Sequence, residues 1–344
     1  MTRSFERVFD RAEVAVVGAG NFGTALADLL AYQGYRVHLW VYETDLAEEM
    51  ARTHENVRYV PGFRIHSDVL PSADIAQVVS GKPIVLFVTP AQVTRSVLEQ
   101  AGPHLDPAAV VVCCAKGIEI ASCRLMSEVM DEVLPEPNRG ATAYLSGPSF
   151  ARELMKRLPT VVTVASRDEE IAQLVQQVVA CDFLRVYSTT DVVGVEVAGA
   201  VKNVMAIAAG IGDGLGFGHN ARAALITRGL AEITRLGLAL GAQPVTFAGL
   251  AGVGDLVLTC TGDLSRNRTV GLKLGAGMAL DEIVRGMGQV AEGIGTTRAV
   301  YQLAEKLNVY MPIVEEVYRI LYEGKPPRQA VVDIMARPLR REDA

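Results

Sequence analysis

The sequence predicts an α/β protein in two parts: a doubly wound sheet domain over residues 1–190, followed by an all-helical domain over residues 191–344. Up to about residue 190, short apolar runs alternate with helix-length amphipathic stretches, and several of these runs are rich in Val. Continuous apolar runs of this kind are typical of parallel strands buried on both faces. From Asp191 onward strand-like segments disappear, and helix-length segments are joined by Gly-rich turns. A length of 344 residues fits two domains.

The expected strands cover residues 14–17, 37–41, 84–88, 110–114, 142–145, 160–165 and 183–187. Helices are expected between them, for example over residues 24–33, 92–100 and 168–179. Because strands and helices alternate, we expect a mainly parallel sheet covered by helices on both faces. The last strands lie closer together along the chain, so that end of the sheet can include antiparallel neighbours.

Composition and charge exclude several classes of function. Lys and Arg number 33 against 39 Asp and Glu, aromatic residues make up 6% of the chain, and no basic run occurs before the last few residues, so we expect no nucleic-acid partner. The charged N-terminus lacks the apolar core of a secretory signal, and the five cysteines form no CxxC pair, which predicts a cytoplasmic protein. The uncharged stretch 236–254 contains Pro244 and five glycines, so we expect a helix end and a loop there rather than a transmembrane segment.

A glycine-rich motif lies at the first expected strand–helix junction. Gly18, Gly20 and Gly23 form the pattern GxGxxG between AEVAVV and TALADLLAYQG. In this context the first glycine permits a tight turn, the second lets the backbone approach a pyrophosphate, and the third lets the helix pack on the strand. The helix N-terminus then offers N–H donors to phosphate. The alternative is an ordinary strand–turn–helix with no ligand, but the surrounding pattern favours a Rossmann-like dinucleotide site.

An acidic residue follows the second expected strand. Glu43 lies about twenty residues after the last glycine of the motif, where a carboxylate accepts hydrogen bonds from the ribose of NAD and repels the 2′-phosphate of NADP. Tyr42 and Glu43 can equally be plain loop residues, so this is the weaker half of the pattern.

The first long helix of the second domain, expected over residues 193–210, is apolar on nearly every face and carries Lys202 and Asn203 in its middle. A helix apolar all round is expected to be buried. Its lysine either extends to the surface or is held in a site. The small neighbours Gly199, Ala200 and Ala206 leave little bulk around it, and burial lowers a lysine's pKa toward neutrality, so we favour proton exchange with an alcohol oxygen.

Other polar candidates follow strand ends or precede helices. Lys116 and Ser149 come after two expected strands, at the edge where open α/β sheets bind ligands. Asp255 follows a Gly-rich loop and can be a simple helix cap. The run Ser265-Arg266-Asn267-Arg268 offers a guanidinium and short donors suited to a phosphate monoester, although an exposed basic turn is the alternative. The five histidines are scattered, and a lysine acid/base needs no metal, so none is expected.

Taken together, the motifs resemble bacterial NAD(P)-dependent glycerol-3-phosphate dehydrogenase. The resemblance covers nearly the whole chain and rests on GAGNFGTALA, AKGIE, LSGPSFARE, EVAGAVKNVMAIAAGIGDG, LAGVGDLVLTC, SRNR and VAEGIGTT. It implies reduction of dihydroxyacetone phosphate to sn-glycerol 3-phosphate, a phospholipid precursor, with NAD or NADP as cofactor. It further implies that Lys202 donates and accepts the proton.

The resemblance also implies a role for each matching residue. Around the reacting oxygen it places Lys116, Asn203, Asp255 and Thr259. For the substrate phosphate it implies Ser265, Arg266 and Asn267, with Gly147 and Ser149 from the first domain. For the cofactor it implies Asn21, Phe22, Lys116, Ala151, Arg266, Val290 and Glu292.

Two further expectations follow from the resemblance. Family members that accept NADPH often carry Arg or His where this chain has Tyr42, so we predict a preference for NADH. Family subunits commonly pair through the helical half, which makes a homodimer plausible. The rival interpretations are a related two-domain dehydrogenase of hydroxyacids or sugar acids, a non-catalytic dinucleotide sensor and, more weakly, a flavoprotein.

Overall fold

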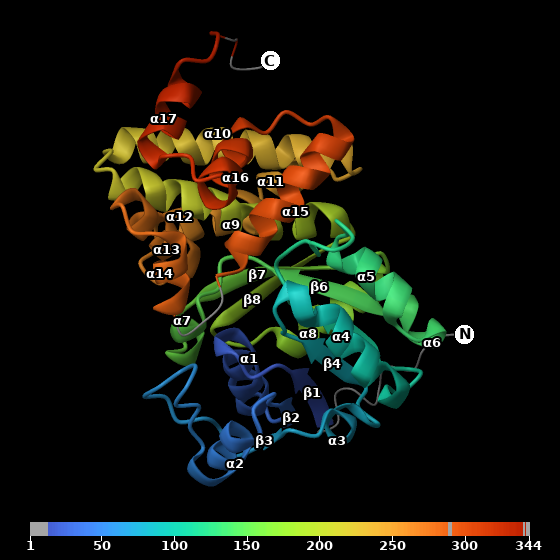
Figure 1. Cartoon of the computed structure of the whole chain (residues 1–344). Coiled ribbons are helices and arrows are strands. Elements are labelled where there is room, and N and C mark those ends of the chain that lie inside the picture. Colours follow the sequence, from blue (N-terminus) through green and yellow to red (C-terminus); the bar gives the residue numbers. More distant parts are fainter. Residues whose placement is uncertain (1–12, 288–290, 340, 342–344) are drawn as a thin grey trace.

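The computed structural model describes residues 13–287, 291–339 and 341. A single eight-stranded sheet, flanked by helices, lies beneath a stack of helices formed by the second half of the chain (Figure 1). The predicted fold class is confirmed: strands occur only up to Thr189, and the described residues beyond it form helices and their connections.

The strand order is β3-β2-β1-β4-β5-β6-β7-β8. The strands are β1 Glu13–Val17, β2 Arg36–Trp40, β3 Val69–Ser72, β4 Ile84–Phe87, β5 Val110–Cys113, β6 Thr142–Ser146, β7 Thr160–Ala165 and β8 Leu184–Thr189. All neighbouring pairs are parallel except β6 and β7, which are antiparallel, as the close spacing of the late strands allowed. Seven strands agree with the predicted ones to within about two residues, whereas β3 was missed because its four-residue sequence VLPS carries neither an apolar run nor an alternation.

Both faces of the sheet are buried. In β1, Val14 and Val16 belong to one core layer, while Ala15 and Val17 belong to the other. The first layer packs against α1 (Asn21–Tyr32) and α8 (Glu169–Val179), and the second against α4 (Ala91–Ala101) and α5 (Met126–Val133). Shorter helices complete the domain: α2 Thr44–Thr53, α3 Ile75–Val79, α6 Glu136–Arg139 and α7 Ala151–Met155. Burial on two faces explains why these strands are apolar without alternation.

The helical domain is built around α9, Val192–Gly214. This helix is long and apolar enough to cross a membrane, but 89% of its apolar window is buried among its neighbours, as the apolar residues on all its faces predicted. The neighbours are α10 His219–Ala239, α11 Pro244–Phe247, the wide turn Leu250–Gly254, α12 Asp255–Thr261, α13 Arg266–Gly275, α14 Leu280–Arg285, α15 Glu292–Leu307, α16 Pro312–Tyr322 and α17 Pro327–Met335.

The uncharged stretch that includes Pro244 is interrupted, as predicted. Helix α10 ends at Ala239, and Gly241 takes a φ of 90° before α11 starts. The segment Pro244–Thr261 also passes a length and hydropathy test for a membrane span, but 39% of its window is buried and it comprises α11, the wide turn and α12 rather than one continuous α-helix.

Two glycines determine how closely α13 approaches α9. A Cβ atom at Gly210 of α9 would lie 2.0 Å from the carbonyl oxygen of Arg268, and one at Gly271 of α13 would lie 2.0 Å from that of Ile207. The two backbones are therefore in direct contact, which only glycine permits. This contact carries the N-terminus of α13 toward the middle of α9, where Lys202 lies.

Candidate active site

A cavity of about 710 Å³ lies between the carboxyl ends of the central strands and the helical domain. It brings together most of the predicted site residues from both domains. Those lining it are Gly18, Gly20, Asn21, Phe22, Tyr42, Glu43, Lys116, Ser149, Ala151, Lys202, Asn203, Asp255, Thr259, Ser265, Arg266, Asn267 and Glu292. Gly23 and Gly147 do not line it, and Val290 lies outside the described residues.

The glycine motif forms a tight turn that ends at the start of α1. Gly18 has a φ of 114°, and a Cβ atom there would lie 2.8 Å from the Val88 carbonyl oxygen. A Cβ atom at Gly23 would lie 1.9 Å from the Gly18 carbonyl oxygen. Gly20, by contrast, faces open space and caps α1, so free N–H groups of the first helical turn border the cavity. The loop is therefore packed tightly against the protein at Gly18 and Gly23 and open to the cavity at Gly20, an arrangement that fits the pyrophosphate of a dinucleotide.

Glu43 lies at the far end of this cavity and has partners that the sequence did not reveal. The Tyr59 hydroxyl donates to Glu43 Oε1 at 2.7 Å, and the Arg58 guanidinium lies 3.3 Å from the same oxygen. Burial, reinforced by the Glu43 carboxylate, raises the pKa of Tyr59 to about 12, so the phenol keeps its proton. Tyr42 is 79% exposed and packs edge-on against Trp40. Arg58 and Tyr59 belong to an irregular loop after α2, where no periodic pattern in the sequence indicates which side chains point toward the site.

The centre of the site is one carboxylate between two lysines. Lys202 Nζ donates to Asp255 Oδ1 at 2.8 Å, and Lys116 Nζ donates to Asp255 Oδ2 at 2.8 Å. Lys202 also donates to Thr259 Oγ1 at 2.8 Å, and Lys116 to the Gly147 carbonyl at 2.9 Å. Lys202 is therefore held in a site rather than extended to the surface. Asp255 is the first residue of α12, but its side chain serves the lysines and not the helix end.

Burial determines how these charges titrate. Loss of hydration lowers the pKa of Lys202 to about 8, although the Asp255 carboxylate opposes that shift. For Asp255, burial alone would raise the pKa, but the positive charges of Lys116 and Lys202 outweigh it and hold the pKa below its ordinary value. Near neutral pH the site thus contains an ionised carboxylate and a lysine close to its titration point.

The N-terminus of α13 forms the other end of the site. Arg266 borders the cavity and has no hydrogen bond or ion pair among the described residues. Arg268 of the same run is paired with Asp213 and Asp263, so its guanidinium is already occupied by protein carboxylates. Ser265 caps α13, its hydroxyl oxygen accepting from the Arg268 N–H at 3.2 Å. The free cation of the run is Arg266.

Two asparagines tie α13 to the rest of the site. Asn267 donates to Asn203 Oδ1 at 2.9 Å and accepts from the Gly293 N–H at 3.0 Å. Asn203 in turn lies 3.3 Å from the Lys116 carbonyl oxygen, to which it donates. Both asparagines border the cavity, but much of their hydrogen-bonding capacity joins α9, α13 and α15. Asn203 was predicted beside the substrate oxygens and Asn267 at the phosphate, and both also have a structural function that the sequence did not indicate.

The remaining predicted residues lie at the domain junction. Glu292, at the start of α15, accepts from the Ala91 N–H at 3.0 Å, and burial raises its pKa. Ser149 donates to the Gly147 carbonyl at 3.1 Å, and Ala151 begins α7. The same Gly147 carbonyl accepts a hydrogen bond from Lys116. Gly147 therefore helps to hold the Lys116 ammonium although it does not line the cavity. Among the described residues, no group of three or more His, Cys, Asp or Glu side chains could bind a metal ion.

Comparison with known proteins places this geometry in a family. The N-terminal model of NAD-dependent glycerol-3-phosphate dehydrogenase matches residues 13–172, and the C-terminal model matches residues 191–332. The glycerol-3-phosphate dehydrogenase [NAD(P)+] of Syntrophotalea carbinolica is 55% identical over 329 residues, covering 96% of this chain and 99% of that protein. The corresponding protein of Anaeromyxobacter sp. strain K is 51% identical over 95% of this chain and 98% of its own length.

Solved structures agree. Glycerol-3-phosphate dehydrogenase from Coxiella burnetii superposes with a TM-score of 0.91 at 40% identity, covering 95% of this chain and 99% of that one. The Saccharomyces cerevisiae enzyme gives a TM-score of 0.79 at 29% identity, covering 95% of this chain and all of that one. The resemblance found in the sequence motifs is confirmed: this chain belongs to the NAD-dependent glycerol-3-phosphate dehydrogenase family.

Proposed function

We propose that this NAD(P)-dependent dehydrogenase interconverts dihydroxyacetone phosphate and sn-glycerol 3-phosphate with Lys202 as the proton donor and acceptor. The single observation that carries the assignment is the Lys202 ammonium, buried within 2.8 Å of both Asp255 and Thr259 and bordering the cavity. A bound nicotinamide supplies or accepts the hydride. A charged lysine stabilises the negative charge that develops on the C2 oxygen and then protonates it.

The two ends of the site fit the two ends of a small phosphorylated ketone. Lys116, Asp255, Thr259 and Asn203 surround Lys202 and would orient the oxygens near the reacting carbon. Arg266 brings an unpaired guanidinium to the other end, beside the Ser265 and Asn267 positions. Ser149 would contribute from the first domain, while Gly147 would contribute indirectly, through the carbonyl oxygen that holds Lys116. Phosphate binding remote from the reacting carbon supplies orientation without touching the bond that changes.

The cofactor would lie along the glycine loop and reach Glu292 and Arg266 at the domain junction. Further contacts would come from Asn21, Phe22 and Ala151, and from Val290, which lies outside the described residues. We propose a preference for NADH. Tyr42 carries no charge, and Glu43 Oε2 has no partner among the described residues, so it is available to a ribose hydroxyl. Arg58 qualifies the sequence argument, because it brings a cation near this carboxylate; however, Glu43 and Asp45 already pair with it.

A direct test measures initial rates of NADH and, separately, NADPH oxidation with dihydroxyacetone phosphate at matched low cofactor concentrations. A rate with either cofactor supports the proposed reaction, and the ratio of the two kcat/KM values tests the NADH preference. In Lys202→Ala the rate should collapse while cofactor binding persists. If this variant kept every activity, or if a hydroxyacid or sugar acid were the better substrate, the assignment would be wrong.

We further propose that the protein acts in the cytoplasm as a homodimer and supplies glycerol 3-phosphate for phospholipid synthesis. In the same proposal, residues 1–190 bind the cofactor, and residues 191–344 bind the substrate and carry the catalytic lysine. Apolar side chains exposed on the helical half, such as Val245 at 72%, support pairing there. Sedimentation equilibrium of the purified protein distinguishes a dimer from a monomer.

A further inference from the structure

Lys116 lies in a long connection without regular secondary structure of its own. Strand β5 ends at Cys113 and α5 begins at Met126. Between them the chain folds back on itself, because Ile118 and Leu125 form an antiparallel bridge and the Glu119 N–H donates to the Arg124 carbonyl at 3.0 Å. We call residues 117–125 the lysine loop. Since Lys116 directly precedes it, the lysine's position depends on whatever holds this loop.

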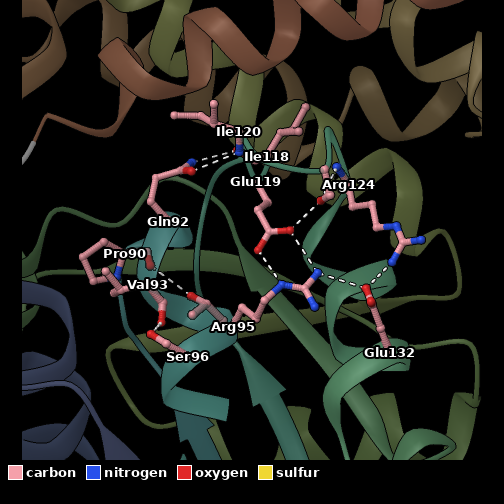
Figure 2. Close-up of polar contacts among 12 residues, drawn as sticks. Pro90, Gln92, Val93, Arg95, Ser96, Ile118, Glu119, Ile120, Arg124 and Glu132 are labelled. Atoms are coloured by element: carbon pink, nitrogen blue, oxygen red, sulfur yellow. Dashed lines mark hydrogen bonds and ion pairs between the residues drawn. The ribbon is translucent and has the colours of Figure 1, made fainter. Parts of the chain in front are cut away.

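One side chain of α4 holds the loop by its backbone. Gln92 Nε2 donates to the Ile118 carbonyl at 2.8 Å, and Gln92 Oε1 accepts from the Ile120 N–H at 3.0 Å (Figure 2). A single amide thus satisfies a donor and an acceptor of the loop. Next to it, Gly117 packs on Ala91 so closely that a Cβ atom at Gly117 would lie 2.6 Å from the Ala91 Cβ.

A second side chain of α4 holds the loop by a partly buried ion pair. Arg95 Nε lies 2.9 Å from Glu119 Oε1, and Arg95 Nη2 lies 3.0 Å from Glu119 Oε2, a two-point contact (Figure 2). The Glu119 side chain is only 8% exposed, and Ser122 Oγ also donates to it. Arg95 reaches Glu132 of α5 as well, to which Arg124 is paired. Planar two-point pairs fix orientation as well as distance.

The same helix borders the cavity on another side. Pro90, Val93 and Ser96 line the cavity, and in Figure 2 they lie on the side of α4 opposite the Arg95 guanidinium. The N-terminus of α4 also contacts the helical domain, through the Ala91 N–H to Glu292. Helix α4 therefore connects the cavity wall beside the glycine loop to the loop that carries Lys116.

We propose that Gln92 and Arg95 are positioning residues: by clamping the lysine loop onto α4, they hold Lys116 where its ammonium reaches Asp255 and the substrate. Neither side chain need touch substrate. Without the Arg95–Glu119 pair the loop loses its two-point anchor, Glu119 is left buried without its cation, and Lys116 samples positions away from Asp255. This inference rests on the proposed function only in assigning Lys116 to the substrate site.

The test compares Arg95→Met with Arg124→Met, a matched control that removes a neighbouring arginine of the same network but leaves Arg95 on Glu119. We expect Arg95→Met to raise KM for dihydroxyacetone phosphate about tenfold, with much smaller changes in kcat and in the Kd for NADH measured by Trp40 fluorescence, because the glycine loop and Glu43 are untouched. Arg95→Lys, which can restore one of the two contacts, should recover part of the loss. Gln92→Leu should raise KM in the same direction, and Arg124→Met should leave KM near the wild-type value.

A double-mutant cycle separates positioning from general stability. If Arg95 acts through Lys116, then Arg95→Met has no further effect on substrate affinity once Lys116 is Met. Additive effects in that cycle, or equal KM values for Arg95→Met and wild type, would overturn the proposal. Should Arg95→Met fail to fold, Glu119→Gln provides the same comparison with a smaller perturbation.

Substrate affinity can also be measured without turnover, by calorimetric titration with sn-glycerol 3-phosphate. Loss of affinity in Arg95→Met but not in Arg124→Met supports the clamp even in a chain with no measurable rate. A chain that binds sn-glycerol 3-phosphate but does not turn over would contradict the proposed reaction and leave the clamp standing. Unchanged affinity in Arg95→Met would contradict the clamp alone.

Discussion

Lys202 and Asp255 form a buried ion pair at 2.8 Å across two helices of the helical domain, and the second oxygen of the same carboxylate binds a lysine of the sheet domain. Asp255 thus joins the two domains at the point where the reaction is proposed to occur. The pKa of Lys202 is therefore governed first by burial, which lowers it, then by the Asp255 carboxylate, which opposes that shift, and by the neighbouring Lys116, which adds to it.

The pH dependence should follow the Lys202 pKa of about 8. Reduction requires the protonated lysine, so kcat/KM for dihydroxyacetone phosphate should fall above that pH. Oxidation requires the neutral lysine, so its kcat/KM should rise through the same pH and level off above it. Initial rates across the range in both directions check this, and an oxidation profile with no inflection near pH 8 would contradict the assignment.

Asp255→Asn should nearly abolish activity. The amide leaves the buried Lys202 and the partly buried Lys116 without their shared counter-charge, which lowers the pKa of Lys202 further and displaces both lysines. We expect kcat/KM to fall by about two orders of magnitude or more, because proton transfer and orientation are lost together. Asp263→Asn, at a carboxylate with a 97% exposed side chain, is the control and should leave kcat/KM nearly unchanged.

Arg266→Ala should weaken recognition of the phosphate specifically. A charged hydrogen-bond partner of a phosphate contributes about 2 kcal/mol, which corresponds to roughly a 30-fold rise in KM for dihydroxyacetone phosphate. At saturating NADH, which offsets any loss of cofactor contact at Arg266, rates with unphosphorylated dihydroxyacetone should not fall. Arg268→Ala, by contrast, should lower the thermal midpoint because it removes one of the two arginines that pair with the largely buried Asp213 carboxylate. Equal losses on both substrates in Arg266→Ala would exclude a phosphate contact.

Tyr59→Phe should reduce the discrimination between NADH and NADPH. Without the 2.7 Å hydrogen bond, Glu43 is held less firmly against the ribose and against a 2′-phosphate. We expect the ratio of kcat/KM for NADH over NADPH to fall by about threefold to tenfold. Arg58→Ala reveals the function of the cation: the ratio falls if Arg58 only holds Glu43, and it rises if Arg58 itself binds a 2′-phosphate.

Glu196→Gln should stabilise the protein at alkaline pH. Glu196 Oε1 accepts from the Ser127 N–H at 2.8 Å, but Oε2 is buried without a partner, and burial raises the pKa to about 7 from an ordinary 4.5. The folded state therefore keeps a proton that the unfolded state releases, so wild-type stability falls as pH rises between these values. We expect the variant to gain about 3 kcal/mol over wild type at pH 9 and little at pH 5, by urea unfolding. Glu99→Gln, at an exposed position, should gain nothing at either pH.

Local patterns in the sequence predicted most of the fold. Continuous apolar runs identified seven strands, and the GxGxxG motif predicted its own turn, because both depend on residues close together in the chain. The burial of Lys202 was predicted for the same reason, since apolar residues surround it on every face of its own helix. The strand β3 was missed because four residues with a proline carry too little pattern.

Tertiary structure decided which side chains meet. Asp255 bonds to Lys116 across 139 residues of sequence, and that contact exists only because the packed domains bring the first residue of α12 beside the segment that follows β5. The sequence marked Glu43 but not its partners Tyr59 and Arg58, and it marked Lys116 but not the clamp formed by Gln92 and Arg95. Periodicity and turn residues determine the local path of the backbone, whereas contacts between distant side chains depend on how closely helices approach. Here Gly210 and Gly271 set that approach by letting two backbones touch.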